Sequence, residues 1–330
     1  MGRATRRAGA AAAVLGAALT CGCSPGNVMG LSVPLTSLSP FTPETTAEGP
    51  SPRPVQDTGT SEATRPKAPP KVSAPRLTRA LDRFLEPYGG RAAAAVRDLS
   101  TGRVYTYHPD LRLPTASTSK VDILMALLLK TPWRELDERG RTDAGMMIRS
   151  SDNAAADRLY ERIGLEAGLA WANRRFGLKD TYAPPGRCAN VYCWGITQTT
   201  APDRIRLLET LVRDGSPLAP DERERVLRLM TQVVPRQSWG ISAAACEGGR
   251  VSLKNGWLHH MANRLWVVVS AGLIREPGHE YVVAVLTEDS PSKDVGIAKV
   301  EGMAKRILAA FRGERGCASG EDQAVLSTSR

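Results

Sequence analysis

The 330-residue chain has little lysine, little histidine and few aromatic residues, and it lacks long apolar runs. Lysine supplies only nine of its 44 basic residues, and aromatic side chains make up 5% of the sequence. The net charge is +10, but no basic block is interleaved with aromatic residues and no zinc-finger or RNA-binding spacing occurs, so we expect no nucleic-acid partner. No apolar stretch reaches the ~18 residues that a membrane-spanning helix needs. With 42% hydrophobic residues, the bulk of the chain is nevertheless expected to fold around a buried core.

Residues 1–23 are typical of an export signal. The first seven residues carry three arginines, residues 8–20 form an uncharged apolar run, and Cys21 and Cys23 follow. A small residue before Cys23 suits lipoprotein processing, in which the cysteine becomes the lipid-bearing first residue, and Cys21 is an equally imperfect match. We therefore expect a secreted or cell-surface protein, which a lipid on one of these cysteines would anchor to the outer face of the cytoplasmic membrane.

The composition divides the rest of the chain into three parts. Residues 24–76 are rich in Pro, Ser, Thr and Gly and poor in large apolar side chains, which indicates a disordered linker. A single folded domain is expected over residues 77–316, and residues 317–330 are expected to form a flexible tail. The linker would tether the domain near a membrane surface if the N-terminus carries lipid, and a merely tolerated extension fits its composition equally well.

Four cysteines follow the linker, namely Cys188, Cys193, Cys246 and Cys317. Outside the cytosol an even number favours disulfides. Cys188 and Cys193 would close a short loop and are the preferred pair, although a sequence does not determine connectivity. The four histidines do not lie at ligand spacing to these thiols, so we expect neither a metal nor a cofactor.

Hydrophobic periodicity predicts an α+β domain. Helices are expected at residues 77–85, 117–130 and 295–311, strands at 91–98, 103–107, 250–254, 264–273 and 281–287, and helical segments across 131–235 around an irregular stretch at 179–200. This order predicts an antiparallel five-stranded sheet flanked by helices, with an all-helical lobe inserted between its second and third strands.

Ser117 and Lys120 form a Ser-x-x-Lys motif at the start of a helix that is apolar nearly all round. At a spacing of three, their side chains share one helix face. A serine hydroxyl becomes a good nucleophile when a base takes its proton, and an amine can do so only where burial or a second cation lowers its pKa. By itself the motif also fits a plain helix cap at Ser117, which is how we interpret a second copy at residues 290–293.

Two more motifs follow in order, Ser-Asp-Asn at residues 151–153 and Lys-Asn-Gly at residues 254–256. With Ser-x-x-Lys, they make the chain resemble the penicillin-recognising serine enzymes, the class A β-lactamases and D-Ala-D-Ala peptidases, across about residues 77–312. Two motifs are complete, and the third has Asn255 where the family has Thr or Ser. The resemblance implies a β-lactamase/transpeptidase-like fold and a serine hydrolase that forms an acyl-enzyme.

The resemblance also implies the catalytic roles. Ser117 would be acylated, and Lys120 would act as its base or would tune and orient it. Ser151 would pass a proton to the leaving nitrogen, and Lys254 would assist that transfer and attract the substrate carboxylate. On the residues alone, Ser151 also fits a second helix cap and Lys254 a solvated lysine at a strand end.

Four further positions would bind substrate. Asn153 would hydrogen-bond its side-chain amide, and Asn255 could still donate to its carboxylate despite a different shape. Gly256 completes the third motif. The backbone N–H groups of Ser117 and Trp257 would form an oxyanion hole, which the bulk of the Trp257 side chain would crowd.

The loop acid of class A β-lactamases is missing. In that family a loop Glu activates the water that frees the acyl-enzyme, whereas the best alignment places Gly186 there and no acid lies between Asp180 and Asp203. Glu166 is expected to be a surface residue of a helix. Loss of one positioned base costs on the order of 10²–10⁴ in rate, so we expect slow turnover and a long-lived acyl-serine.

Three functions remain open on the sequence: a serine hydrolase acting on a β-lactam or related amide, a D-Ala-D-Ala carboxypeptidase or transpeptidase, and a non-catalytic binding lipoprotein of the same fold. The expected ligand is accordingly a small-molecule β-lactam or a D-Ala-D-Ala peptide, bound by a monomer. His259 and His260 follow the third motif and are expected to face solvent rather than substrate.

Overall fold

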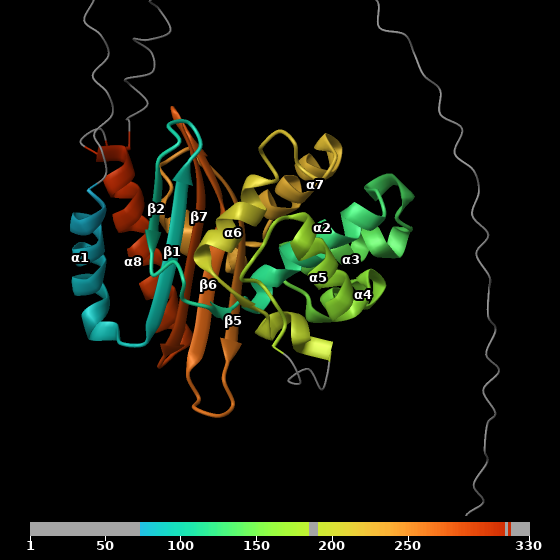
Figure 1. The fold of residues 1–330 in the computed structure, drawn as a ribbon, viewed down its shortest axis with the longest axis horizontal. Helices are drawn as coiled ribbons and strands as arrows, with labels where there is room; N and C mark the ends of the chain where they lie inside the picture. Colours follow the sequence, from blue (N-terminus) through green and yellow to red (C-terminus); the bar gives the residue numbers. More distant parts are fainter. Residues whose placement is uncertain (1–72, 185–190, 314–315, 318–330) are drawn as a thin grey trace, which may run out of the picture. The chain divides into compact units, whose positions relative to one another are not determined.

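The computed structural model describes residues 73–184, 191–313 and 316–317, and its centre is a five-stranded antiparallel sheet (Figure 1). The strand order is β2-β1-β7-β6-β5. The strands are β1 (Arg91–Asp98), β2 (Val104–Tyr107), β5 (Arg250–His259), β6 (Trp266–Glu276) and β7 (His279–Ser290). Strands from the two ends of the domain therefore join in one sheet, and the predicted fold class is confirmed.

Helices cover both faces of the sheet. They are α1 (Ala74–Leu85), α2 (Ser119–Lys130), α3 (Glu138–Arg149), α4 (Asn153–Ile163), α5 (Leu165–Arg175), α6 (Ala201–Glu209), α7 (Pro220–Thr231) and α8 (Lys293–Arg312). Helices α1 and α8 cover one face, which we call the α8 face (Figure 1). The other, the lobe face, is covered by α6 with the predicted helical lobe, α2 to α7, on that side. No helix in the described ranges has the length and apolarity needed to cross a membrane.

Alternation along each strand gives the sheet two separate apolar cores. In β1, Ala93 and Ala95 pack toward the helical lobe, while Ala94 and Val96 pack toward α8. Side chains of successive strand residues point to opposite faces, so a strand buried on both sides is apolar at nearly every position. The same alternation decides which residues of β5 can reach a site on the lobe face.

Two elements differ from their predicted bounds in ways that matter for the site. The buried helix begins at Ser119 instead of residue 117, because Ala116 has a left-handed φ of 44° and a short helix, Ala116–Thr118, precedes α2. Strand β5 continues to His259, so the Lys-Asn-Gly motif lies within the strand and pairs with β6 throughout. The second Ser-x-x-Lys copy is a loop and helix cap as predicted, since the Ser292 hydroxyl accepts a hydrogen bond from the backbone N–H of Val295 at the start of α8.

A disulfide joins Cys246 to Cys317, with 5.5 Å between their Cα atoms. It connects the segment before β5 to the chain that follows α8, across a sequence separation of 71 residues. The preferred pairing of Cys188 with Cys193 falls partly outside the described residues, because Cys188 is not among them.

Candidate active site

Two buried lysines from distant parts of the chain meet at one hydroxyl. The Ser151 Oγ accepts hydrogen bonds from Lys254 Nζ at 3.0 Å and from Lys120 Nζ at 3.2 Å. Lys120 Nζ also donates to the Ser151 carbonyl and to Asn153 Oδ1, both at 2.7 Å. Side-chain hydrogen bonds thus link the three predicted motifs. Lys120 on α2 and Lys254 on β5 both contact Ser151, at the start of α4.

Ser117 lies beside this cluster, one turn before Lys120 and against the edge strand β5. A Cβ atom added to Gly256 would lie 2.5 Å from the Ser117 backbone nitrogen, so only glycine allows this approach. Ala116 and Thr118 are buried while Ser117 is partly exposed. Ser117 thus keeps some exposed surface, whereas the two lysines that meet at Ser151 are buried.

Backbone strain marks both serines. Ala116, directly before Ser117, has φ 44°, and Ser151 has φ 60°. A residue other than glycine held in the left-handed region costs of order 1–3 kcal/mol, and such residues cluster at functional sites. The strain at Ser151 turns its hydroxyl toward the lysines and leaves helix capping to its neighbour, because Asp152 Oδ1 accepts the backbone N–H of Ala155 at 2.7 Å.

Burial makes both amines poor cations. The side chain of Lys120 is fully buried, which lowers its pKa to about 7 against the opposing effect of the Asp152 and Asp157 carboxylates. Burial also lowers the pKa of Lys254 well below its ordinary value, and the charge of nearby Lys120 lowers it further. An amine with such a pKa is partly neutral near neutral pH and can accept a proton from a hydroxyl.

Asn255 and Trp257 lie on the opposite side of β5 from Lys254 and Gly256. The Asn255 carboxamide is fully buried and donates to the backbone carbonyls of Gln237, at 2.8 Å, and Trp239, at 2.7 Å. In this structure it therefore holds the segment before β5 in place, where the resemblance implied a contact with the substrate carboxylate.

The indole of Trp257 packs away from Ser117. Its ring lies 6.1 Å from that of Trp239 and 5.2 Å from Lys293 Nζ at the start of α8. The expected crowding of the oxyanion hole does not follow, because strand alternation sends this side chain to the α8 face. Its backbone N–H remains the candidate second donor beside that of Ser117.

Sequence reasoning missed two residues next to Lys120. The ring of Trp194 is centred 4.7 Å from Lys120 Nζ, and its Nε1–H donates to Asp157 Oδ1 at 2.8 Å. Asp157 could have been found, because it lies one turn after Asn153 on the same face of α4. No local pattern distinguishes Trp194, which comes from the irregular stretch before α6.

Glu166 and Asp180 precede the position of the missing loop acid in the sequence. Glu166 is exposed on α5, as predicted, and Asp180 pairs with Arg112. Gly186 lies outside the described residues. Within the described ranges no group of His, Cys, Asp and Glu side chains is arranged to hold a metal ion.

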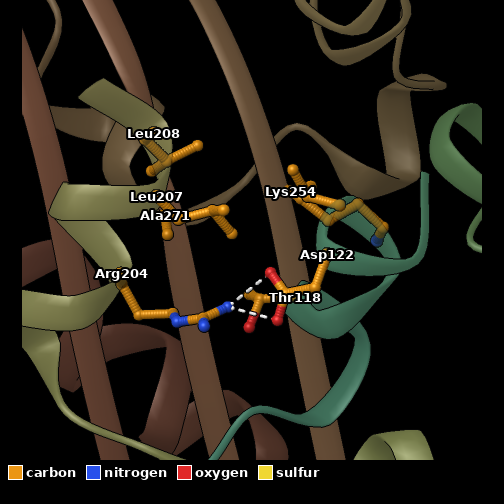
Figure 2. Close-up of a pocket in the computed structure, with 8 residues that line it drawn as sticks. Thr118, Asp122, Arg204, Leu207, Leu208, Lys254 and Ala271 are labelled. Carbon is orange, nitrogen blue, oxygen red and sulfur yellow. Dashed lines mark hydrogen bonds and ion pairs between the residues drawn. The ribbon is translucent and has the colours of Figure 1, made fainter. Parts of the chain in front are cut away.

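A buried ion pair supports the site from behind (Figure 2). Arg204 on α6 donates to both carboxylate oxygens of Asp122 on α2, at 2.7 and 2.8 Å, and both side chains are almost completely buried. Between this pair and the stem of Lys254 lies a cavity of about 10 Å³, which has room for a single water at most. The cavity is too small for a substrate, and the ion pair links α2 to α6.

The two histidines after the third motif are partly buried against protein groups. His260 Nε2 lies 2.7 Å from Glu288 Oε1 on β7, and the ring of His259 packs at a tilt of 40° against that of Trp266, with 4.7 Å between centroids. Both contacts stabilise the β5–β6 hairpin. The expectation of solvent-facing side chains holds only in part.

The comparison with protein families identifies the family of the chain. The chain matches the family described as "Beta-lactamase enzyme family" over residues 76–137 and 141–311, and it belongs to that family. Among curated proteins it is similar to "Putative lipoprotein LppW" of Mycobacterium tuberculosis and Mycobacterium bovis, with 28% identity over 207 residues. That match covers 60% of this chain, which spans 63% of the length of those relatives.

Solved structures show the same fold. PBP-A covers 72% of this chain and 96% of its own at 22% identity, with a TM-score of 0.60. A class A β-lactamase from Bacteroides cellulosilyticus covers 73% of this chain and 99% of its own at 15% identity, with a TM-score of 0.63. A variant of PBP-A, solved as an acyl-enzyme complex with penicillin G, covers 72% and 97% at 22% identity and a TM-score of 0.60.

Proposed function

We propose that this protein is a serine hydrolase that is acylated on Ser117 by a β-lactam or a related amide and that releases the acyl group slowly. The observation that carries the proposal is the convergence of two buried, pKa-lowered lysines on the Ser151 hydroxyl beside the partly exposed Ser117. Burying two amines costs desolvation energy that their hydrogen bonds to neutral groups offset only in part. Their presence is best explained by proton transfer.

Acylation then involves three proton transfers, as the Ser117 oxygen bonds to the carbonyl carbon and the C–N bond breaks. Neutral Lys120 takes the proton of Ser117 Oγ, and the oxygen bonds to the carbonyl carbon of the substrate. Backbone N–H groups of Ser117 and Trp257 stabilise the oxyanion. When the C–N bond breaks, Ser151 gives its proton to the nitrogen and regains one from the Lys120 ammonium that the first step formed, with Lys254 holding the same oxygen.

Asn153 would orient the substrate. Its Oδ1 is fixed by Lys120 Nζ, so its amide NH₂ group is directed elsewhere, and the residue is exposed. A donor at this place suits the side-chain amide oxygen of a penicillin or of a peptide. Lys254 has almost no exposed surface, so it would attract a carboxylate through its charge when protonated and not by direct contact in this conformation.

The absence of the loop acid supports slow release of the acyl group from Ser117. A peptidase acting on D-Ala-D-Ala peptides manages without that acid, which makes it the second candidate function. A non-catalytic lipoprotein is the third, in keeping with the name of the mycobacterial relatives. We also propose that the protein is exported and tethered by an N-terminal lipid.

The test is intact-protein mass spectrometry after incubation with a fluorescent penicillin. We expect one penicilloyl adduct per chain in the wild type, persisting after the free reagent is removed, and none in Ser117→Ala. Absence of any adduct in the wild type would leave only the non-catalytic function. A stopped-flow trace that shows rapid steady-state hydrolysis without a burst would exclude slow release, and release of D-Ala from an acylated D-Ala-D-Ala peptide would favour the peptidase.

A further inference from the structure

Protein groups enclose much of the Lys120 amine. An ammonium has three donors, and Lys120 Nζ has three acceptors: the Ser151 carbonyl at 2.7 Å, the Ser151 hydroxyl at 3.2 Å and Asn153 Oδ1 at 2.7 Å. The indole ring of Trp194 covers a further side, with its centroid 4.7 Å away. The amine itself has no exposed surface.

Trp194 is held in this place from two directions. Its Nε1–H donates to Asp157 Oδ1 at 2.8 Å, and its carbonyl accepts the hydroxyl of Thr115 at 3.1 Å. The backbone N–H of Thr115 in turn donates to the Thr197 carbonyl at 2.8 Å. Thr115 lies two residues before Ser117, so the indole is fixed relative to the turn that carries the nucleophile. Only 3% of the Trp194 surface is exposed.

Hydrolysis of the acyl-enzyme needs a water and a base beside the ester. The water oxygen must bond to the ester carbonyl carbon while a base takes its proton, the C–O bond to Ser117 breaks, and Ser117 Oγ regains a proton. With the loop acid missing, Lys120 is the base already placed beside the nucleophile, so the water would have to stand between Lys120 and the ester. A planar ring packed on the amine excludes it.

We infer that Trp194, positioned by its hydrogen bond to Asp157, keeps water away from Lys120 and so determines how long the acyl group stays on Ser117. This inference rests on the proposed function. Asp157 is a positioning residue in it: the carboxylate orients the indole and does not touch the reacting atoms. The opposite role, in which Asp157 itself activates water, requires its negative charge instead of its acceptor oxygen.

The two roles are separated by paired substitutions. Asp157→Asn keeps an amide oxygen that can accept the indole N–H, so we expect an acyl-enzyme lifetime within about twofold of the wild type. Asp157→Ala and Trp194→Phe lose the hydrogen bond, and we expect lifetimes at least fivefold shorter. The lifetime is measured as loss of the adduct from protein labelled with fluorescent penicillin, and Glu166→Gln, exposed on α5, is the matched control with no change. A longer lifetime in Asp157→Asn would show that Asp157 is the base and overturn the inference.

A second measurement does not depend on acylation. Reductive methylation with formaldehyde, read by peptide mass spectrometry, reports which amines are accessible to small molecules. We expect Lys120 to stay unmodified in the wild type while exposed Lys179 reacts, and to become modified in Asp157→Ala and Trp194→Ala once circular dichroism shows that they fold. Rapid modification of wild-type Lys120 would overturn the inference even if the protein is acylated. Failure of acylation with Lys120 protected would instead count against the proposed function.

Discussion

The two faces of the sheet bury very different chemistry. The α8 face is covered by an apolar core, braced at its margin by the Cys246–Cys317 disulfide and by the ion pair of Arg312 with Glu276. The lobe face buries Lys120 and Lys254 and places strained backbone beside them. Desolvated amines and left-handed non-glycine residues both reduce stability. At the proposed site, two desolvated amines on one hydroxyl thus coincide with left-handed backbone at Ala116 and Ser151.

Lys299 shows that a buried lysine alone does not make a site. It lies on α8 with no exposed surface, and burial lowers its pKa as it does for Lys120. Its amine donates only to the backbone carbonyls of Gly89, at 2.9 Å, and Glu288, at 3.4 Å. What distinguishes the lobe face is a pair of amines on one serine hydroxyl beside a second, partly exposed serine.

The largest difference between the two faces is expected when one buried lysine on each face is replaced with methionine. Lys120→Met removes the proposed base, and we expect acylation by a penicillin reporter to fall by on the order of 10²–10⁴. The thermal unfolding temperature should not fall to a comparable extent. The substitution replaces a buried amine, which costs desolvation energy, with an apolar side chain of similar length. Lys299→Met is the matched control and should leave the acylation rate unchanged. Equal losses of rate in both variants would mean that general destabilisation is being measured.

Removal of the Cys246–Cys317 disulfide tests how the α8 face contributes to stability. A cross-link spanning 71 residues restricts the unfolded chain, and on the loop-entropy model its loss costs about 4 kcal/mol. We expect Cys246→Ser to lower the unfolding free energy by an amount of this order in urea titration, with the acylation rate below the transition unchanged. A large loss of acylation in the still-folded variant would show that the two faces are coupled.

Sequence reasoning succeeded where a local pattern carries the information. Period-two alternation and apolar helices predicted the five strands and the helical lobe. The alternation also places Lys254 and Gly256 on one side of β5. From this, the orientation of the Trp257 side chain toward the α8 face could have been deduced. The contacts of Trp194 with Lys120 and of Cys246 with Cys317 join segments far apart in the chain, and no local propensity encodes them. The left-handed φ of Ala116 was equally hidden, because neighbours in the folded protein enforce it.

The pH dependence of acylation should report Lys120. With a pKa of about 7 it is the neutral form that accepts the Ser117 proton, so the rate should fall about tenfold for each pH unit below 7 and level off above. Asp152 and Asp157 on α4 favour its charged form, while Lys254 on β5 is a neighbouring amine. Asp157→Asn should therefore shift the profile to lower pH. A profile that is flat between pH 5 and 8 would contradict Lys120 as the base.

The same shift affects stability in a defined direction. The pKa of Lys120 is lower in the folded protein than in the unfolded chain, where a lysine titrates near 10.5, so the unfolded state binds more protons between pH 7 and that value. This group's contribution to stability consequently rises with pH across that window. Lys120→Met should reduce the slope of unfolding free energy against pH there, as measured in urea titrations.

The smallest expected effects come from two helix caps, one on each face. Asp152 caps α4 beside Ser151, and Ser292 caps α8, each by accepting a backbone N–H from three residues further along the chain. Replacing either with alanine should lower the unfolding free energy by about 1 kcal/mol. Only Asp152→Ala should also slow acylation, because the cap holds the turn in which Ser151 has its left-handed conformation. If both variants acylate at the wild-type rate, the lysine contacts alone maintain the turn at Ser151. The left-handed backbone of Ser151 would then not depend on the Asp152 cap.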